Sequence, residues 1–272
     1  MNKTSKNGRY RIAFIDLDDT LLGPSKQIST DNQEALDCLR SAGVEIAIAS
    51  GRHHRNITAL RQLGPTGWVL SSNGSVVRHE QTGEVLAETY LDGALALELG
   101  TQAHALGLSA IGYHGDGAFV ERTSEWTELY ARESGWTPKT VRFAALDPAR
   151  FQKVIWAGHP ERIRALAPPM QEEYSAHASV LVTNPELLEF FPRCVNKAVG
   201  AQALADRLAI PAGETLAFGD GSNDVELLRW AGLSVAMDHG RAMARHAARL
   251  VTPPGPPENA FARAVEQALH FR

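Results

Sequence analysis

The sequence predicts an α/β protein whose parallel sheet is interrupted by a second, inserted module. Short apolar runs alternate with helix-like segments at both ends of the chain, as expected for parallel strands joined by crossover helices. Between residues 84 and 189 the strands become more polar and the helices less regular. We therefore expect a Rossmann-like core formed by residues 1–83 and 190–272, with an inserted α/β module formed by residues 84–189.

The first half of the core contains three apolar runs, each followed by a turn or helix signal. The first helix is bounded by Thr30 or Asp31 as its N-cap and by Gly43 as its stop. The third run closes on the turn pair Asn73-Gly74. The expected elements are strands at 11–15, 44–50 and 68–71 and helices at 30–42 and 54–63.

Regular alternation resumes at Lys197 and continues to the end of the chain. The prolines of residues 253–257 predict a stiff connection before the last helix. The expected elements are helices at 197–208, 225–231 and 257–269 and strands at 215–219, 233–236 and 249–251.

Composition excludes several classes of function. A net charge of -4 over 272 residues gives no electrostatic reason to expect nucleic acid or a membrane as a partner. The two cysteines, Cys38 and Cys194, lack metal-ligand spacing, and we expect both to be buried. Aspartates interrupt the first apolar stretch, which argues against a signal peptide or membrane span. We expect a cytoplasmic protein that acts on small solutes.

Polar residues follow three of the predicted strands directly. These groups are Asp16-Leu-Asp18-Asp-Thr20, Ser50-Gly-Arg52 and Gly219-Asp-Gly-Ser-Asn-Asp224. Each group taken alone would be ordinary turn or helix-cap chemistry. Their order, each at a strand end of one predicted sheet, makes a shared site the better interpretation, because open parallel sheets bind ligands at that edge.

The residue types in these groups favour phosphoryl transfer with Mg²⁺. Asp16, Asp18, Asp220 and Asp224 supply only carboxylate oxygens, the ligands that Mg²⁺ prefers, and no His or Cys accompanies them. A carboxylate can also act as a nucleophile and form an acyl phosphate. Ser50, the Gly51 amide and the ammonium of Lys197 are candidate partners of phosphate oxygens.

These residues resemble the Cof-type phosphatases of the haloacid dehalogenase superfamily, from Ile12 onward. Residues 16–22 are similar to the first family motif, Ser50-Gly-Arg52 to the second, Lys197 to the third and residues 219–224 to the fourth. The resemblance implies a haloacid dehalogenase core with a cap inserted between the second and third motifs. The turn Asn73-Gly74 also matches a family turn near the cap junction.

The resemblance also implies a role for each matching residue. Asp16 would be the nucleophile and Asp18 the general acid and base. Asp16, the backbone carbonyl of Asp18, and Asp220 would hold Mg²⁺. Asp224 would orient metal-bound water or brace the loop. The residues that would contact phosphate are Ser50, Gly51, Lys197 and Asn223.

The sequence departs from the family pattern in three places. Asp19 stands where Cof-type members usually have Gly, and Asn196 and Ala198 flank Lys197 where Ser and Gly are commoner. Residues 236–239, Ala-Met-Asp-His, replace a usual Ala-Met-Gly-Asn. The last change puts bulk and charge beside the site, so Asp238 and His239 are expected to affect substrate size and local geometry.

The expected function is Mg²⁺-dependent hydrolysis of a small phosphate monoester, such as a sugar phosphate, through an aspartyl-phosphate. A sugar phosphomutase of the same superfamily and a non-catalytic phosphometabolite-binding protein are the alternatives. The substrate and the oligomeric state stay open. Candidate substrate contacts in the inserted module are His114, Asp116, Glu125, Trp126 and Arg132, and the other histidines, His53 and His54 among them, are expected at the surface.

Overall fold

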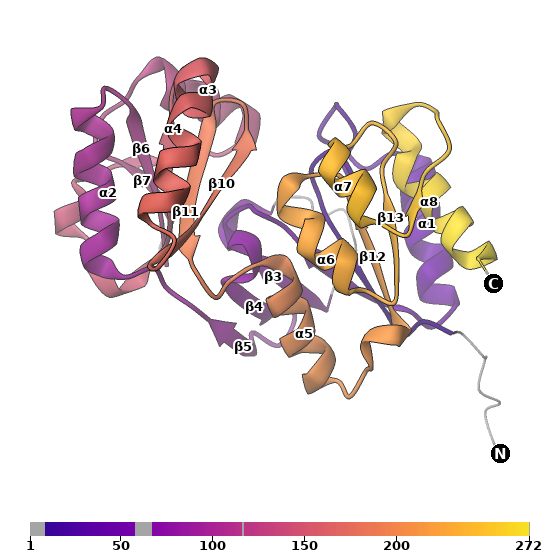
Figure 1. The fold of residues 1–272 in the computed structure, drawn as a ribbon. Coiled ribbons are helices and arrows are strands. Elements are labelled where there is room, and N and C mark those ends of the chain that lie inside the picture. The colour runs from indigo at the N-terminus through magenta and orange to yellow at the C-terminus, as the bar shows by residue number, and fades with distance from the viewer. Residues whose placement is uncertain (1–8, 58–66, 116, 272) are drawn as a thin grey trace. The chain divides into compact units, whose positions relative to one another are not determined.

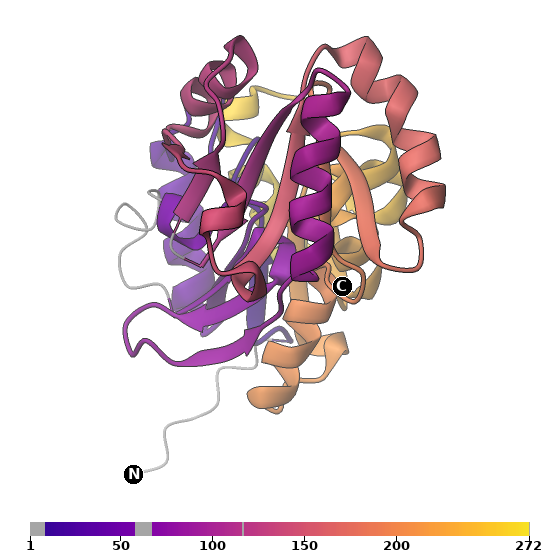
Figure 2. The same cartoon turned by 90° about the vertical axis from the view of Figure 1, so that its left-hand side faces the viewer.

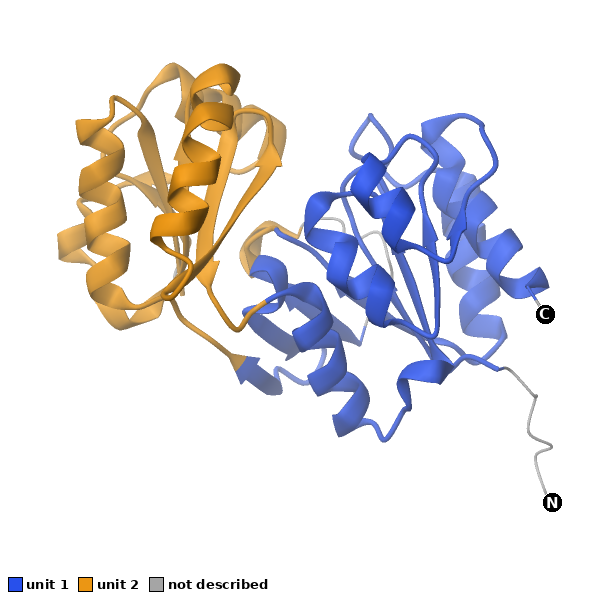
Figure 3. Ribbon diagram, viewed as in Figure 1, with its two compact units in different colours: residues 1–51, 58–87, 196–272 blue, residues 52–57, 88–195 orange. Residues whose placement is uncertain are grey.

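The computed structural model describes residues 9–57, 67–115 and 117–271. These residues form two compact units, each with its own sheet (Figure 3). The first unit contains residues 1–51, 58–87 and 196–272, and the second contains residues 52–57 and 88–195. The expected module limits, 84 and 189, lie a few residues from these boundaries. Residues 52–57 were expected with the core, but their contacts join them to the second unit.

The first unit is built on an eight-stranded sheet. Its strands, in spatial order, are β14 (Leu250–Val251), β13 (Leu233–Ala236), β12 (Thr215–Gly219), β1 (Ile12–Ile15), β2 (Glu45–Ala49), β3 (Trp68–Ser71), β4 (Val76–His79) and β5 (Val85–Glu88). The strands from β14 to β3 are parallel, whereas β4 runs antiparallel to β3. The parallel order places the ends of β1, β2 and β12 at one edge.

Helices cover both faces of this sheet, which explains the continuous apolar character of its central strands (Figure 1). The helices α1 (Thr30–Ser41) and α8 (Ala260–His270) pack together on one face. The helices α5 (Lys197–Arg207), α6 (Val225–Trp230) and α7 (Ala242–Ala247) line the other, where they share a core with β1, β2 and β3. Every residue of β1 is buried.

Most expected core elements agree with the observed ones to within one or two residues at each end. The expected helix at 54–63 is different: a 3-10 turn covers His54–Asn56, and residues 58–66 lie outside the described part of the chain. The expected last helix begins with a 3-10 turn, Pro257–Asn259, before α8. The expected Asn73-Gly74 turn is part of the 3-10 turn Ser72–Gly74 that connects β3 to β4.

The second unit contains a six-stranded, mainly antiparallel sheet (Figure 2). Its strands, in spatial order, are β10 (Ala178–Asn184), β11 (Leu187–Pro192), β9 (Phe151–Ala157), β6 (Ser109–His114), β7 (Gly117–Val120) and β8 (Lys139–Thr140). One face shares a core with α2 (Gly93–Ala105) and α4 (Pro160–Glu173). The other face packs on α3 (Glu125–Ser134).

The expected burial of the cysteines is wrong, because both Cys38 and Cys194 are exposed. Cys38 belongs to α1, whose buried stripe consists of Asn32, Ala35, Leu36 and Leu39. The position of Cys38 falls outside that stripe, and helical periodicity therefore turns it toward solvent. None of the described helices is long and apolar enough to cross a membrane.

Candidate active site

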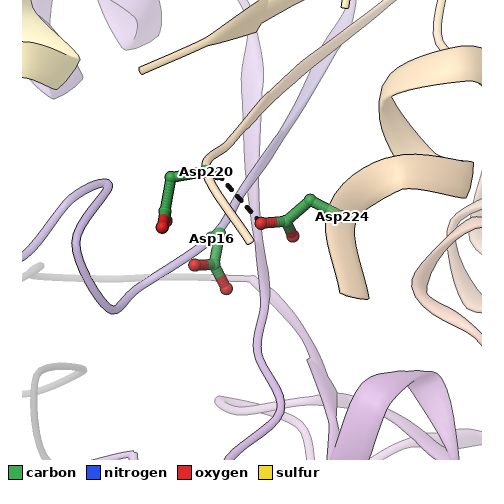
Figure 4. A group of neighbouring side chains, drawn as sticks. All are labelled: Asp16, Asp220 and Asp224. Atoms are coloured by element: carbon green, nitrogen blue, oxygen red, sulfur yellow. Dashed lines mark hydrogen bonds between the residues drawn. The ribbon is translucent and has the colours of Figure 1, made fainter. Parts of the chain in front are cut away.

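Three aspartates meet at the carboxyl edge of the first sheet (Figure 4). Asp16 follows β1, and its backbone N–H donates to the carbonyl of Phe218 in β12 at 3.0 Å. Asp220 follows β12 directly, and Asp224 lies one turn further on. One carboxylate oxygen of each aspartate lies within 4.8 Å of the others. The parallel pairing of β1 with β12 thus brings together residues about 200 positions apart.

Lys197 is the cation of this cluster and is completely buried. Its Nζ donates to a carboxylate oxygen of Asp16 and, at 2.6 Å, to Oδ1 of Asp224. Lys197 is the first residue of α5, and the side chain of Asn196 caps this helix by accepting from the N–H of Val199 at 2.9 Å. The cap therefore fixes the point from which the lysine reaches the aspartates.

Electrostatics of the cluster are dominated by burial and by excess negative charge. Burial, together with repulsion from Asp224, raises the pKa of Asp16 well above its usual value. The same two causes raise the pKa of Asp220 to about 7. Burial lowers the pKa of Lys197, but Asp16 and Asp224 outweigh it and raise that pKa overall. The cluster contains three carboxylates and one ammonium group, so a further cation would offset its excess negative charge.

The donor set fits a magnesium ion. Asp16 and Asp220 offer carboxylate oxygens close together, and no described His or Cys belongs to the group. Oxygen-only ligands and uncompensated negative charge are what a hard divalent cation requires. The expected contact through the carbonyl of Asp18 stays a prediction.

Asp224 is a brace for the loop that carries Asp220. Its Oδ2 accepts from the backbone N–H groups of Asp220 at 3.0 Å and Gly221 at 2.8 Å (Figure 4). Its other oxygen accepts from Lys197. The role in catalysis that the resemblance implied for Asp224 stays a prediction.

Thr20 is a site residue that the sequence interpretation missed. Its buried hydroxyl donates to Oδ1 of Asp220 at 2.8 Å, across 200 residues of chain. A polar residue just after Asp16 and Asp18 was the only available signal, because nothing in the local sequence names the distant partner.

The expected phosphate-binding residues lie around one turn. Ser50 is buried, and its carbonyl accepts from the N–H of Asn73 at 3.0 Å. The side chain of Asn73 accepts from Nδ2 of Asn223 at 2.9 Å. Gly51 fits closely against both amides, because a Cβ atom there would lie 3.0 Å from Asn73 Oδ1 and 3.2 Å from Asn223 Nδ2. Asn73, predicted only as a turn residue, thus links Ser50, Gly51 and Asn223.

Asp18 is more exposed than Asp16 and Asp224. Its side chain is about one-third exposed, and its Oδ1 lies 3.3 Å from the ammonium of Lys26. Lys26 also approaches Asp19 at 3.5 Å. The structure therefore places Asp18 with a cation from the following loop, a partner that the sequence did not indicate.

Candidate residues of the inserted module lie at different depths. His114 is buried, and one ring nitrogen lies 3.1 Å from the carbonyl of Asp147. Glu125 and Arg132 are exposed on α3, where Trp126 is partly buried against His159. Asp116 lies outside the described residues. The geometry of the described residues does not assign these side chains a ligand, so their contact with substrate stays a prediction.

Comparison with known proteins decides the family. The family model of the haloacid dehalogenase-like hydrolases matches residues 13–264. The chain belongs to this family. The match confirms the resemblance found in the sequence and makes the protein an enzyme of the hydrolase class.

Relatives of the chain carry phosphatase names. A putative phosphatase from Haemophilus influenzae is 28% identical over 234 residues, covering 84% of this chain and 85% of the relative. An HMP-PP phosphatase from Serratia proteamaculans is 29% identical over 231 residues, covering 84% of each chain.

Solved structures confirm the fold of this haloacid dehalogenase-like hydrolase. The structure of a haloacid dehalogenase-like hydrolase from Bacteroides thetaiotaomicron has a TM-score of 0.84 at 24% identity. This match covers 95% of this chain and 99% of that one. A protein from Thermotoga maritima has a TM-score of 0.80 at 24% identity, covering 95% and 97%. At this identity the likeness concerns the fold alone.

Proposed function

We propose that this hydrolase is a Mg²⁺-dependent phosphatase that cleaves a small phosphate monoester through an aspartyl-phosphate on Asp16. The observation that carries the proposal is the place of Asp16: its carboxylate is buried at a strand end, held by Lys197 and surrounded by acidic groups that favour a divalent cation. Relatives with phosphatase names support the same reaction class.

In the first step, an oxygen of Asp16 attacks phosphorus and the bond from phosphorus to the leaving oxygen breaks. Lys197 keeps the Asp16 carboxylate oriented and offsets the repulsion between that carboxylate and the phosphate dianion. Ser50, the N–H of Gly51 and Asn223 hold phosphate oxygens. Asp16, Asp220 and the carbonyl of Asp18 would hold Mg²⁺, which would supply positive charge to offset the negative charge of the phosphoryl group.

Asp18 moves the protons in both steps. In its protonated form it gives its proton to the departing alkoxide, which leaves as an alcohol. As a carboxylate it then takes a proton from water, and the resulting hydroxide oxygen attacks the phosphorus of the aspartyl-phosphate. Phosphate leaves, Asp16 is regenerated as a carboxylate and Asp18 is again protonated. Its partial exposure leaves it accessible to water.

The composition and the relatives support the proposed substrate class. A net charge of -4 favours small solutes over polyanions. A sugar phosphate or a similar phosphometabolite is the proposed substrate, and the relatives named HMP-PP phosphatases make HMP-PP the first compound to include in a substrate panel. Release of inorganic phosphate distinguishes hydrolysis from the phosphomutase reaction.

The substitution Asp16→Asn tests the proposal. An amide is a poor nucleophile of nearly the same shape, so kcat for p-nitrophenyl phosphate should fall on the order of a thousandfold or more. The matched control is Asp206→Asn, because Asp206 is exposed on α5 and its carboxylate accepts a hydrogen bond from Gln202 of the same helix. A rate of phosphate release within tenfold of wild type in Asp16→Asn would remove Asp16 from the nucleophile's role.

A further inference from the structure

The loop after β13, residues 237–241, packs against the backbone of Asp220. The N–H of Arg241 donates to the carbonyl of Asp220 at 2.8 Å. Gly240 approaches the same residue so closely that a Cβ on it would lie 3.0 Å from the Cα of Asp220. The loop therefore supports the acidic strand end from one side.

The same loop is fixed to the C-terminal part of the first unit. The Asp238 carboxylate accepts from the hydroxyl of Thr252 at 3.0 Å and from Nη2 of Arg263 at 3.2 Å. Arg245 donates to the carbonyls of Asp238 and Gly240 at 2.9 and 2.8 Å. These bonds anchor both sides of the intervening residue, His239.

His239 reaches from this anchored loop to the loop after β1. Its Nε2 lies 2.8 Å from the carbonyl oxygen of Asp19. A carbonyl only accepts, so Nε2 carries the hydrogen and donates it. Asp19 has a φ of +56°, a left-handed conformation that residues with a Cβ atom adopt much less often than glycine does. A conformation of this kind persists only where the surroundings hold it.

The peptide group that His239 holds joins Asp19 to Thr20. Thr20 donates to Asp220, and Asp18 precedes the same turn. We propose that His239 is a positioning residue, which keeps the left-handed Asp19 turn in place and thereby sets Asp18 and Thr20 for the reaction. The expected effect on reaction rate rests on the proposed function. The support that His239 gives to the Asp19 turn does not.

Two substitutions of His239 separate the hydrogen bond from the bulk of the ring. His239→Ala removes the donor, whereas His239→Gln places an amide N–H near the position of Nε2. For the Mg²⁺-loaded full chain acting on p-nitrophenyl phosphate, we expect His239→Ala to lower kcat about tenfold with KM little changed, because a misplaced proton donor affects the chemical step. His239→Gln should restore most of the rate. His246→Ala, which alters an exposed histidine of α7, is the control.

A double substitution tests whether His239 acts through Asp19. Glycine adopts the left-handed conformation without the Cβ penalty, so Asp19→Gly should reduce the need for the brace. In that background His239→Ala should lower kcat by less than about threefold, compared with tenfold in the native background. Equal losses in both backgrounds would overturn the proposal.

Hydrogen exchange of the metal-free protein gives a readout that does not require activity. The backbone amides of residues 17–22 should exchange faster in His239→Ala than in wild type, His239→Gln or His246→Ala. Unchanged exchange in His239→Ala would contradict the brace even if activity fell. Conversely, a wild-type protein that releases no phosphate would refute the proposed function while the exchange result still decides the role of His239.

Discussion

Lys197 and its carboxylate neighbours combine strong attraction with a large cost of burial. At 2.6 Å from Asp224, the ammonium gains about 6 kcal/mol at an effective dielectric constant of 20. Removing each ion from water costs several kcal/mol, and the lysine bonds only two of the three clustered carboxylates, Asp16 and Asp224. The metal-free cluster therefore carries uncompensated negative charge at neutral pH, and a bound divalent cation would offset this charge.

That charge predicts an unusual pH dependence for Asp220. The pKa of its carboxyl group is about 7 in the folded chain and 3.8 ordinarily, so the folded state binds the proton more tightly. Its contribution to stability is present below pH 3.8 and is lost as pH rises through 7. Between pH 8 and 4, metal-free wild type should gain up to about 4 kcal/mol relative to Asp220→Asn, measured by urea unfolding with EDTA.

Binding of Mg²⁺ at Asp220 should stabilise the folded chain, as protonation of this carboxylate does. At pH 8, Mg²⁺ should raise the free energy of unfolding of wild type but have little effect on Asp220→Asn. Asp206→Asn serves as the exposed control and should follow wild type. If plots of unfolding free energy against pH for wild type and Asp220→Asn stayed parallel from pH 8 to 4, the raised pKa assigned to Asp220 would be wrong.

The turn Ser72–Gly74 contacts segments that are distant from it in sequence. Its three residues have φ values of +49°, +59° and +93°, and all three are buried. Asn73 bonds the Ser50 backbone and the Asn223 side chain, and Gly74 lies against the backbone of Asn196, the cap of α5. The turn therefore aligns elements that carry the proposed phosphate-binding residues.

Gly74→Ala should damage both stability and activity. A Cβ at this position would lie 2.6 Å from the carbonyl oxygen of Asn196, and the residue has a left-handed φ. We expect a loss of about 2 kcal/mol or more in unfolding free energy, with a fall in kcat because Lys197 follows the displaced residue.

The matched control for this substitution is Gly213→Ala, since no atom lies within 4 Å of a Cβ there and its φ is not left-handed. Urea unfolding and steady-state kinetics on both variants provide the measurements. Gly74→Ala with the stability and rate of Gly213→Ala would mean that the turn does not align the site.

Sequence patterns located the elements of the core well, because strands buried on both faces appear as continuous apolar runs. The run expected at 44–50, for example, forms β2 at Glu45–Ala49. They also placed Asp16, Asp220 and Asp224 at one edge. They could not identify Thr20 or Asn73 as partners of Asp220 and Asn223, because those contacts depend on tertiary pairing across 150 to 200 residues.

The assignment of residues 52–57 shows how the molecule is divided. Directly after Gly51, the chain joins the second unit. His53 was expected at the surface, and that is wrong: its ring is buried between Tyr113 and Trp136, with Nε2 2.8 Å from the carbonyl of His114. Its Nδ1 accepts from the N–H of Arg55 at 3.1 Å. The neutral ring thus satisfies both nitrogens within this unit.

Burial predicts that His53 makes the second unit sensitive to acid. Burial lowers the pKa of His53 from 6.5 to about 4, so the unfolded chain takes up a proton that the folded chain does not. Its contribution to stability is present above pH 6.5 and is lost as pH falls toward 4. His53→Gln keeps an amide donor for His114 but cannot titrate in this range.

Between pH 7 and 4, wild type should therefore lose up to about 3 kcal/mol of unfolding free energy relative to His53→Gln. Chemical unfolding followed by the fluorescence of the tryptophans of the second unit, Trp126, Trp136 and Trp156, is the measurement. His270→Gln, at an exposed position of α8, is the control and should track wild type. Identical pH profiles for wild type and His53→Gln would contradict the assignment.

The central claim for the whole molecule is that the phosphoryl group is transferred to Asp16 before water releases it as phosphate. The most direct test is to quench the Mg²⁺-loaded enzyme in acid during turnover of p-nitrophenyl phosphate, digest it with pepsin and locate the phosphoryl group by mass spectrometry. The account predicts a base-labile phosphoryl group on the peptide containing Asp16, absent from Asp16→Asn. A phosphoryl group on another residue would contradict it. So would turnover without any phosphorylated peptide in an Asp18 variant, in which slow hydrolysis should make the aspartyl-phosphate accumulate.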